Sequence, residues 1–448
     1  MEENESFAVN VMRPNIVIRP PGPRAKAMVE RDAKVSSRSL ARVYPLVVDK
    51  AYGVNIEDVD GNRFLDFNSG IAVMNLGYSH PRIVEAVKHQ AELITHGAFL
   101  EFYADVPTEF SEKLLSFIPS MDRVFLTNSG TESVEAAMKL ARHYTKRKYF
   151  ISFYGSFHGR SLGALSLTSS KIVHRKDFGP FLPVIHVPYA NPYRCPLRAS
   201  EDECAQACLD YITNVVFKTE VSPEEVAAIF VEPVQGEGGY VVPPKDFLKG
   251  LREICTKYGI LYVDDEVQAG CFRTGRFLAT EHFGVEPDVV CLAKALGGGL
   301  PLGAIVCKAD FMTWPPGSHA STFGGNMLSC AAGIATLDVV KEKGFGSNVL
   351  NSGATIISYL KELQQESSFI GDVRGLGLMI GLELVKNKES KETNTQMRDA
   401  VVHDAFEKGL LLLPAGESSI RIAPPIIIGR EDIEAGLEIL GKSIQKHI

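Results

Sequence analysis

The sequence has no excess of positive charge, no long apolar run and no basic residue in its first six positions. Its 47 lysines and arginines are outnumbered by 54 aspartates and glutamates, and the resulting net charge of −7 gives no sign of nucleic-acid binding. The longest apolar runs, such as residues 410–413, are far too short to span a bilayer. The acidic start, residues 1–6, lacks the basic residues and apolar core of a signal peptide. We therefore expect a cytoplasmic protein with no nucleic-acid or membrane partner.

The sequence also lacks a Cys-x-x-Cys pair, although it holds eight cysteines. The closest two, Cys204 and Cys208, stand at helical spacing. Metal ligation or a disulfide at this pair is one interpretation, but free thiols in a reducing compartment explain scattered cysteines more simply. The sequence therefore predicts no metal site.

The chain does contain a long alternation of short apolar strands with amphipathic helices. Its 448 residues are too many for one compact core, so we expect more than one domain. The alternation between about residues 105 and 335 is typical of a mostly parallel α/β sheet that binds ligands at the carboxyl ends of its strands. The strands predicted there are 124–127, 149–153, 227–232, 261–264, 289–292 and 303–307.

After about residue 335 the pattern changes to an α+β unit. We predict an N-terminal segment, 1–68, that packs with the small domain, a large α/β domain, 69–335, and a small C-terminal domain, 336–448. Residues 13–24, rich in proline and arginine, are expected to run extended over a surface. The small domain is predicted to hold helices at 347–366, 395–408 and 430–446 and strands within 371–383 and at 420–428.

One lysine stands in an apolar and glycine-rich stretch. Lys294 follows an acidic strand end at Asp264 and Asp265. Burial strips an ammonium group of its hydration, lowers its pKa and leaves a neutral, nucleophilic amine. An enzyme that holds pyridoxal phosphate needs such a lysine for the cofactor aldehyde and a strand-end carboxylate for the ring nitrogen. Lys294 and one of the two aspartates are therefore candidates for that chemistry.

Two loops that precede helices are rich in hydroxyl groups and glycine. Ser129, Gly130 and Thr131 open one helix, where unpaired N–H groups and a positive dipole attract an anion. Thr322 lies in a second loop of this kind, residues 319–326. Either loop alone is equally well explained as an ordinary helix cap. With Lys294 in the same chain, phosphate binding becomes the better explanation.

Other candidates follow strand ends or stand in an apolar strand. Phe157, which Arg160 follows closely, is flanked by glycines and either stacks on a flat ring or belongs to the core. Glu232 and Glu237 border a glycine-rich turn, where solvated acids are the simpler explanation unless an arginine lies nearby. Arg421 stands in an apolar strand and either binds a carboxylate through two hydrogen bonds or points to water.

Together these segments resemble the class III (ornithine/4-aminobutyrate type) aminotransferases of pyridoxal-phosphate fold type I. The resemblance extends from about residue 44 to residue 425, and its most specific stretch, 261–303, combines Asp-Glu-Val-Gln, Arg-Thr-Gly and Ala-Lys-Ala-Leu-Gly-Gly-Gly. It implies a mostly parallel seven-stranded sheet in the large domain, a smaller α+β domain and pyridoxal 5′-phosphate as the cofactor. It also implies a homodimer or higher homo-oligomer with shared active sites.

The resemblance implies a role for each motif residue. Lys294 is expected to be the Schiff-base lysine and Asp265, rather than Asp264, the catalytic partner of the ring nitrogen. Thr322 is expected to reach the phosphate of the neighbouring subunit. The cofactor-binding residues implied are Ser129, Gly130, Thr131, Phe157, His158, Asp265, Val267, Gln268, Lys294 and Thr322. The substrate-binding residues implied are Ile71, Arg160, Glu232, Glu237 and Arg421.

The resemblance predicts an aminotransferase that moves an amino group from 4-aminobutyrate, or another ω-amino or broad-range amino acid, to 2-oxoglutarate. Arg421 would hold the α-carboxylate and Arg160 a distal one, while Glu237 would neutralise Arg421 when the donor has no α-carboxylate. Ornithine is disfavoured, because Ile71 stands where ornithine enzymes tend to carry tyrosine. The main alternative is an amino-acid racemase that uses the same Lys294 chemistry. A non-catalytic binding protein is opposed by the presence of both Lys294 and Asp265.

Overall fold

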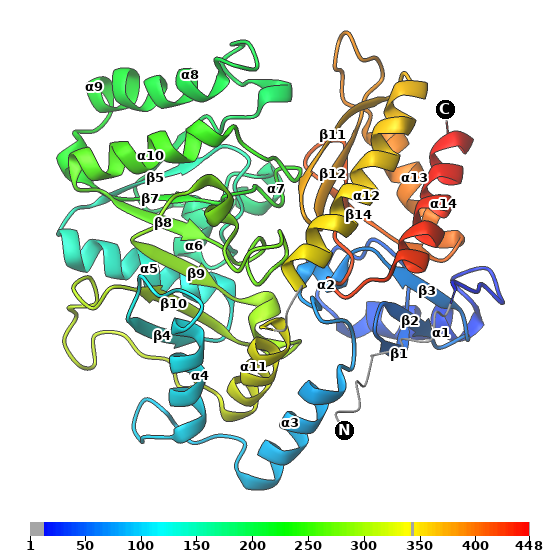
Figure 1. Cartoon of the computed structure of the whole chain (residues 1–448), viewed down its shortest axis with the longest axis horizontal. Coiled ribbons are helices and arrows are strands. Elements are labelled where there is room, and N and C mark those ends of the chain that lie inside the picture. Colours follow the sequence, from blue (N-terminus) through cyan, green and yellow to red (C-terminus); the bar gives the residue numbers. More distant parts are fainter. Residues whose placement is uncertain (1–12, 342–344, 448) are drawn as a thin grey trace.

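The computed structural model describes residues 13–341 and 345–447 and is built around a seven-stranded sheet (Figure 1). The strand order is β4-β10-β9-β8-β7-β5-β6, and only β10 runs antiparallel to its neighbours. The strands are β4 (Arg123–Thr127), β5 (Tyr149–Phe153), β6 (Val184–Val187), β7 (Val226–Val231), β8 (Leu261–Asp265), β9 (Val289–Leu292) and β10 (Gly303–Cys307). The predicted mostly parallel sheet is therefore confirmed.

Six of these strands match the predicted ones to within one residue at either end, but β6 has no predicted counterpart. It is a four-residue edge strand with a histidine, His186, in its middle, and it pairs only with β5. A short strand with a polar residue in it gives little hydrophobic pattern. The local sequence pattern therefore did not predict β6.

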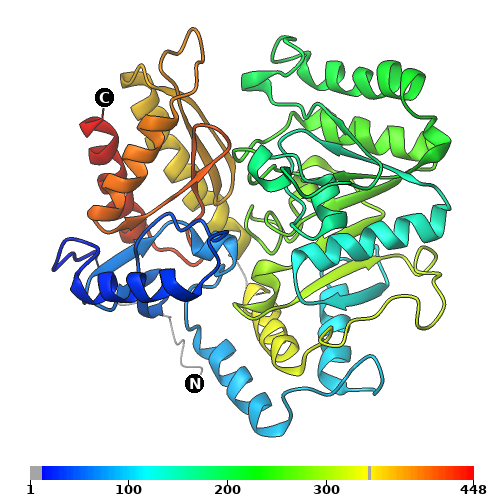
Figure 2. The same ribbon diagram turned by 180° about the vertical axis from the view of Figure 1, so that it is seen from behind.

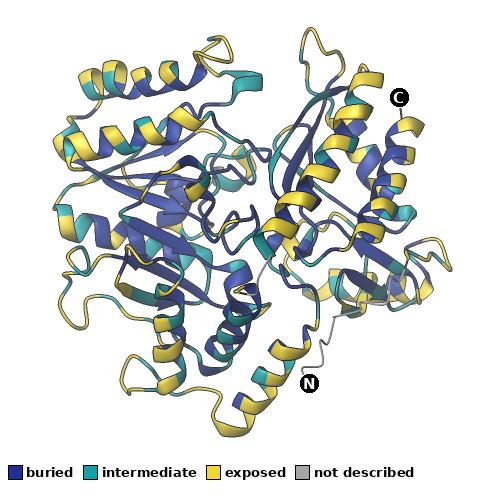
Figure 3. Ribbon diagram, in the orientation of Figure 1, coloured by how far each residue is buried: buried dark blue, intermediate teal, exposed yellow. Residues whose placement is uncertain are grey.

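Helices cover both faces of the sheet, because its strands are apolar on both sides. In β5, for example, Phe150 packs in the core with α5, whereas Ile151 and Phe153 pack in the core with α8 and α10. Figure 3 shows buried strands between helices whose outer faces are exposed. The helices of this half are α3 (Pro81–Leu93), α4 (Asp105–Leu115), α5 (Gly130–Thr145), α6 (Leu162–Leu167), α7 (Ile172–Arg175), α8 (Cys204–Asp210), α9 (Phe217–Thr219), α10 (Lys245–Tyr258) and α11 (Met327–Val340).

The remaining elements form two smaller sheets beside the large one (Figures 1 and 2). The first combines strands from the N-terminal and C-terminal parts of the chain, in the order β1 (Val48–Tyr52), β2 (Asn55–Asp58), β3 (Arg63–Asp66) and β13 (Leu410–Leu411). Strand β13 pairs in parallel with β3, and the other pairs are antiparallel. The second has the order β11-β12-β15-β14. Its strands are β11 (Ile370–Leu376), β12 (Met379–Leu384), β14 (Leu413–Ala415) and β15 (Ser419–Ile422).

Helices α12 (Phe345–Glu366), α13 (Thr395–Glu407) and α14 (Arg430–Lys446) pack against these smaller sheets, close to their predicted positions. Strand β15 ends at Ile422, well before the predicted residue 428, because Pro424 and Pro425 follow. Helix α1 (Pro23–Val35) begins inside the stretch expected to be extended, since proline is well suited to the first position of a helix. The domain boundaries at residues 68 and 335 stay predictions.

Within the described ranges, no helix combines the length and the apolar character that crossing a bilayer requires.

Candidate active site

A cavity of about 420 Å³ lies at the carboxyl ends of β5, β7, β8 and β9 and is closed on one side by the turn after β3. This is where an α/β sheet is expected to bind its ligand. The predicted site residues that line the cavity are Ile71, Gly130, Thr131, Phe157, His158, Arg160, Glu232, Glu237, Asp265, Val267, Gln268 and Lys294. The structure therefore brings together residues that lie up to 223 positions apart in the chain.

Lys294 lies in the floor of this cavity, directly after β9, where the chain turns into a short 3-10 helix, Lys294–Gly297. Its φ of 48° falls in the left-handed region, which is uncommon for a residue with a side chain and costs conformational energy. Burial lowers the pKa of the Lys294 amine, the positive charge of Arg421 adds to this, and the negative charge of Asp265 opposes it. The site thus increases the fraction of neutral amine.

Asp265 ends β8 and faces the cavity, while its neighbour Asp264 faces the other side of the sheet, as alternation along a strand requires. The Nδ1 atom of His158 lies 2.7 Å from Oδ2 of Asp265, and the backbone N–H of Val267 donates to Oδ1 over 3.1 Å. Burial opposes protonation of His158, but the hydrogen bond and charge of Asp265 outweigh it and raise the pKa of His158. The carboxylate of Asp265 is therefore held in one orientation.

The N-terminus of α5 borders the cavity. Ser129 is its N-cap, and its Oγ accepts a hydrogen bond from the backbone N–H of Glu132 over 3.3 Å. Gly130 and Thr131 line the cavity beyond this cap. A Cβ atom on Gly130 would stand only 2.7 Å from Cγ1 of Val267, so glycine is required for the helix to approach the strand end this closely. Helix N–H groups and the Thr131 hydroxyl suit a phosphate group.

The carboxylate of Glu232 fixes the backbone on the side of the cavity that Phe157 lines. Phe157 donates its backbone N–H to Oε2 of Glu232, and Gly236 donates its own to Oε1, each over 3.0 Å. Burial raises the pKa of Glu232 to about 7. Glu232 lines the cavity, and each of its carboxylate oxygens accepts one of these backbone hydrogen bonds, while its predicted contact with substrate stays a prediction. We infer that it supports Phe157, which lines the cavity as Val267 does.

Glu237 and Arg421 form an ion pair at the substrate side. The Nη2 atom of Arg421 donates to Oε1 of Glu237 over 2.6 Å, and Arg421 also donates to the carbonyl oxygen of Pro414. Arg421 is only 5% exposed and is not among the residues that line the cavity, whereas Glu237 is. Burial alone would raise the pKa of Glu237, but the charges of Arg421 and Lys171 outweigh it and lower that pKa. Glu237 therefore lies between the buried arginine and the cavity.

Lys171 and Tyr240 belong to this site but were not predicted from the sequence. The Nζ atom of Lys171 lies 3.6 Å from Oε2 of Glu237, on the side away from the Arg421 contact. The hydroxyl of Tyr240 donates to Oε1 of Gln268 over 2.8 Å and so orients that amide. Lys171 stands in a polar loop without a motif, and the pattern around Tyr240 is typical of an aromatic residue in the core. The sequence therefore did not indicate that either residue belongs to the site.

The other predicted residues lie at the edge of the cavity or outside it. Arg160 is exposed at the rim, with its guanidinium carbon 5.6 Å from the centre of the Phe157 ring. Ile71 is 44% exposed and has a left-handed φ of 67° in the turn Ser69–Ala72. Thr322 is exposed and does not line the cavity. Its predicted contact with a neighbouring subunit stays a prediction.

The residues present fit pyridoxal phosphate, since an anion site, a buried carboxylate and an amine of lowered pKa meet in one cavity. The fold and this site define a pyridoxal-phosphate enzyme of fold type I. The chain belongs to the class III aminotransferase family, whose model matches residues 36–444. Its cofactor is pyridoxal 5′-phosphate, as predicted.

Individual relatives show a mixture of activities. The chain is 40% identical over 441 residues to an alanine/serine racemase of Pyrococcus horikoshii, covering 96% of this chain and 93% of the relative. It is 39% identical over 397 residues to a probable 4-aminobutyrate aminotransferase of Bacillus subtilis, covering 87% and 91%. A solved ornithine aminotransferase of Toxoplasma gondii is 30% identical with a TM-score of 0.83, covering 94% and 95%. Proteins similar to this chain thus carry the names of different reactions and different substrates.

Proposed function

We propose that this protein is an aminotransferase that passes an amino group from 4-aminobutyrate, or another ω-amino or broad-range amino acid, to 2-oxoglutarate. The observation that carries the proposal is the 2.6 Å ion pair between Glu237 and Arg421 at the substrate side of the cavity. Bound pyridoxal phosphate supplies an aldehyde for the substrate amine and a ring that takes up electrons from the substrate carbon. Every other contribution comes from the chain itself.

Lys294 is the proton carrier in this proposal. Its amine has a lowered pKa and lies in the cavity floor, where Nζ can take a proton from the substrate carbon that bears the amino group and later return one. Asp265, held by His158 and by the backbone N–H of Val267, keeps a negative charge available for a protonated ring nitrogen. Thr131 and the start of α5 hold the phosphate.

The paired Glu237 and Arg421 solve a charge problem that arises when two kinds of substrate use one cavity. An ω-amino donor has no carboxylate beside its amino group, so an unpaired Arg421 would be a buried, uncompensated charge. Glu237 neutralises it in the arrangement seen here. When 2-oxoglutarate enters, Glu237 turns aside and Arg421 binds the α-carboxylate, while Arg160 at the rim binds the distal one.

Replacing Glu237 tests this proposal directly. In Glu237→Ala, Arg421 is permanently free, so kcat/KM for 4-aminobutyrate should fall relative to that for L-alanine, each measured with 2-oxoglutarate as acceptor. The loss of one charged hydrogen bond corresponds to a change of roughly tenfold or more in this ratio. Glu389→Ala, an exposed glutamate outside the cavity, serves as the control. An unchanged ratio would refute the switch.

Racemisation is the second candidate function, favoured by the 40% identity to an alanine/serine racemase over nearly the whole chain. Lys294 would then return the proton to the substrate carbon itself, and no oxo acid would be consumed. Incubating single enantiomers of alanine, serine and leucine without an oxo acid, followed by chiral chromatography, separates the two functions. Appearance of the mirror form at a rate above that of glutamate formation with 2-oxoglutarate would favour the racemase.

A donor screen with 2-oxoglutarate should include ornithine, because a solved relative is named as an ornithine aminotransferase. Ile71 lines the cavity at the position where the family resemblance leads us to expect a tyrosine in ornithine enzymes, so we expect weak activity with ornithine. The proposal also includes a homodimer in which Thr322 of one subunit serves the other. Light scattering of Thr322→Ala and of the unmodified protein, together with cofactor retention, would test that arrangement.

A further inference from the structure

Three cysteines converge at a place that has no part in the candidate active site. Cys195 follows the 3-10 helix Pro192–Arg194, and Cys204 and Cys208 stand one turn apart on α8. All three Sγ atoms lie within 4.8 Å of one another. Cys204 and Cys208 are fully buried, and Cys195 is half-buried. Sequence spacing alone pointed to Cys204 and Cys208 only, since Cys195 is nine positions earlier in an irregular loop.

We propose that these three thiols form a zinc site that fastens the loop at residues 188–203 to α8. Zinc binds thiolate sulfur at about 2.3 Å in tetrahedral geometry, which places ligand sulfurs about 3.8 Å apart. Sulfurs already within 4.8 Å therefore need to move by no more than about 1 Å to bind one ion. The half-buried Cys195 lies in a loop that can make this adjustment, and its partial exposure lets a water molecule fill the fourth position.

A disulfide explains the cluster less well. Cys204 and Cys208 stand four residues apart on one helix, where Cβ atoms are about 5–6 Å apart, but a disulfide needs about 3.5–4.5 Å. Two ligands at this helical spacing are instead a common way to hold a metal on one helix face. A bridge from Cys195 to either of them would leave the third thiol without a role. A zinc ion uses all three.

The cluster offers three sulfur ligands within one small and mostly buried volume. Zinc binding replaces the proton on each ligating thiol, and its apparent affinity should therefore fall at acidic pH. The cluster lies in an apolar core that also contains Tyr189, which keeps competing water away from the two buried sulfurs.

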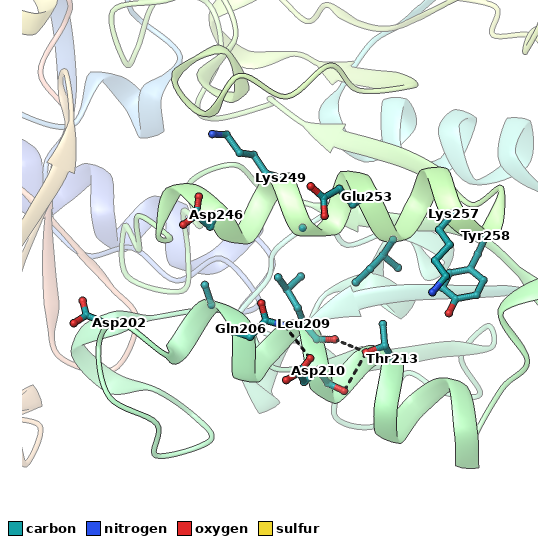
Figure 4. Close-up of a pocket in the computed structure, with 13 residues that line it drawn as sticks. Asp202, Gln206, Leu209, Asp210, Thr213, Asp246, Lys249, Glu253, Lys257 and Tyr258 are labelled. Carbon is teal, nitrogen blue, oxygen red and sulfur yellow. Dashed lines mark hydrogen bonds between the residues drawn. The ribbon is translucent and has the colours of Figure 1, made fainter.

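The cluster is separate from a groove of about 480 Å³ between α8 and α10, shown in Figure 4. That groove is lined by polar side chains such as Gln206, Asp210 and Lys249, and none of the three cysteines lines it. Carboxylates and amides on an open surface are poor ligands for zinc compared with buried thiols. The proposed site is therefore the cysteine cluster, and not the larger groove beside the same helix.

The loop that contains Cys195 contacts the sheet β11-β12-β15-β14, to which Arg421 belongs. Arg194, the residue before Cys195, forms an ion pair with Glu383 on β12. The other carboxylate oxygen of Glu383 pairs with Arg374 over 2.8 Å, and Arg374 donates to the carbonyl oxygen of Gly239 over 2.7 Å. The zinc site would thus hold one end of a chain of contacts that extends to the glycine turn beside Glu237. Its role is structural, and the transamination chemistry does not use it.

Zinc content of the full-length protein tests the proposal without any activity measurement. The chain, purified with its cofactor under reducing conditions, is stripped with a chelator, incubated with Zn²⁺, desalted and analysed by mass spectrometry for metals. We expect one zinc ion per chain and a higher Tm after loading. Cys195→Ser, Cys204→Ser and Cys208→Ser should each weaken zinc affinity at least about tenfold. Cys255→Ser, a buried cysteine of the same core outside the cluster, should leave it unchanged.

A second measurement keeps the test decisive if a serine variant fails to fold. Zinc should protect all three thiols of the unmodified protein from alkylation, as read residue by residue by peptide mass spectrometry. The proposal is overturned if the reduced protein retains no zinc, or if zinc stays bound when all three cysteines are replaced. It is equally overturned if freshly isolated protein carries a disulfide between Cys195 and Cys204 or Cys208.

Discussion

The two walls of the active-site cavity are built in different ways. The cofactor wall consists of Gly130, Thr131, His158, Asp265, Val267 and Lys294, which follow the ends of β4, β5, β8 and β9 in one sheet. The substrate wall consists of Ile71 and Glu237, which line the cavity, together with Lys171 and Arg421, which pair with Glu237 from behind. These four residues come from a turn, two loops and a strand of another sheet.

This difference has a physical basis. Backbone hydrogen bonds fix the register of neighbouring strands, for example Asp265 opposite Cys291, and so the relative positions of the cofactor-wall residues. The substrate wall is held by side-chain pairs, such as Glu237 with Arg421, that can exchange partners. We infer that the chemistry shared by the family depends on the rigid wall, while substrate choice depends on the adjustable one.

The largest expected effect concerns the cofactor wall. Lys294→Ala removes the proposed proton carrier and should lower kcat about 10²–10⁴-fold or more. The loss should be similar for every donor, because the lysine acts on the carbon that all donors share. Stopped-flow half-reactions with 4-aminobutyrate and with L-alanine measure it. Unequal losses with the two donors would mean that the cofactor wall also selects substrates, which contradicts the division drawn above.

The cofactor wall was also the part that the sequence predicted best. Asp265 ends β8, while Lys294 and Gly130 follow the ends of β9 and β4 within three residues, and the sheet brings such residues to one edge. The strands themselves are continuous apolar runs, as in β7, which is buried along its whole length. For these residues, a place at the end of a strand was enough to predict the edge of the sheet at which they lie.

The substrate wall could be predicted only in part. Glu237 and Arg421 are 184 positions apart, and their pairing came from family resemblance, since no local pattern links them. Lys171 was missed because an isolated lysine in a polar loop is usually a solvated charge. Of the three converging cysteines, the sequence pointed only to Cys204 and Cys208. Cys195 was missed because it lies nine positions before Cys204 in an irregular loop, which contacts β12 through Arg194.

The second prediction concerns a buried acid that supports the cofactor wall. Raising the pKa of Glu232 from 4.5 to about 7 makes its ionised form about 3 kcal/mol less favourable in the folded state. The contribution of Glu232 to stability is therefore complete below the unfolded-state pKa and is lost as pH rises through about 7. Glu232→Gln does not titrate, so its Tm should fall less between about pH 5 and about pH 8 than that of the unmodified protein.

Thermal unfolding monitored by circular dichroism measures this difference. The slope of Tm against pH is the relevant quantity, because glutamine also changes the hydrogen bonds to Phe157 and Gly236 at every pH. Glu366→Gln, at an exposed position, should retain the slope of the unmodified protein. Identical slopes for all three proteins would show that Glu232 is not the buried acid described above.

The third prediction turns to the substrate wall. Arg421→Met removes the proposed α-carboxylate anchor, and a charge-assisted hydrogen bond of roughly 1.5–3 kcal/mol corresponds to roughly a 10- to 150-fold rise in KM for 2-oxoglutarate. The variant also leaves Glu237 without its partner, so Arg421→Met combined with Glu237→Gln should be measured beside it. Both variants should retain activity with 4-aminobutyrate in the half-reaction. Loss of that activity as well would assign Arg421 a structural role.

The smallest expected effect tests how adjustable the substrate wall is. When Glu237 leaves Arg421, Lys171 is the cation already 3.6 Å from its other oxygen, and it is 37% exposed. A half-exposed ion pair is worth about 0.2–1 kcal/mol, so Lys171→Met should raise KM for 2-oxoglutarate about two- to fivefold and leave kcat and 4-aminobutyrate kinetics nearly unchanged. Lys176→Met, an exposed lysine of the same segment, is the matched control. A lower KM for 2-oxoglutarate in Lys171→Met would contradict this prediction. It would mean that Lys171 keeps Glu237 paired with Arg421 and does not bind Glu237 after that pair opens. The substrate wall would then be more rigid than we infer.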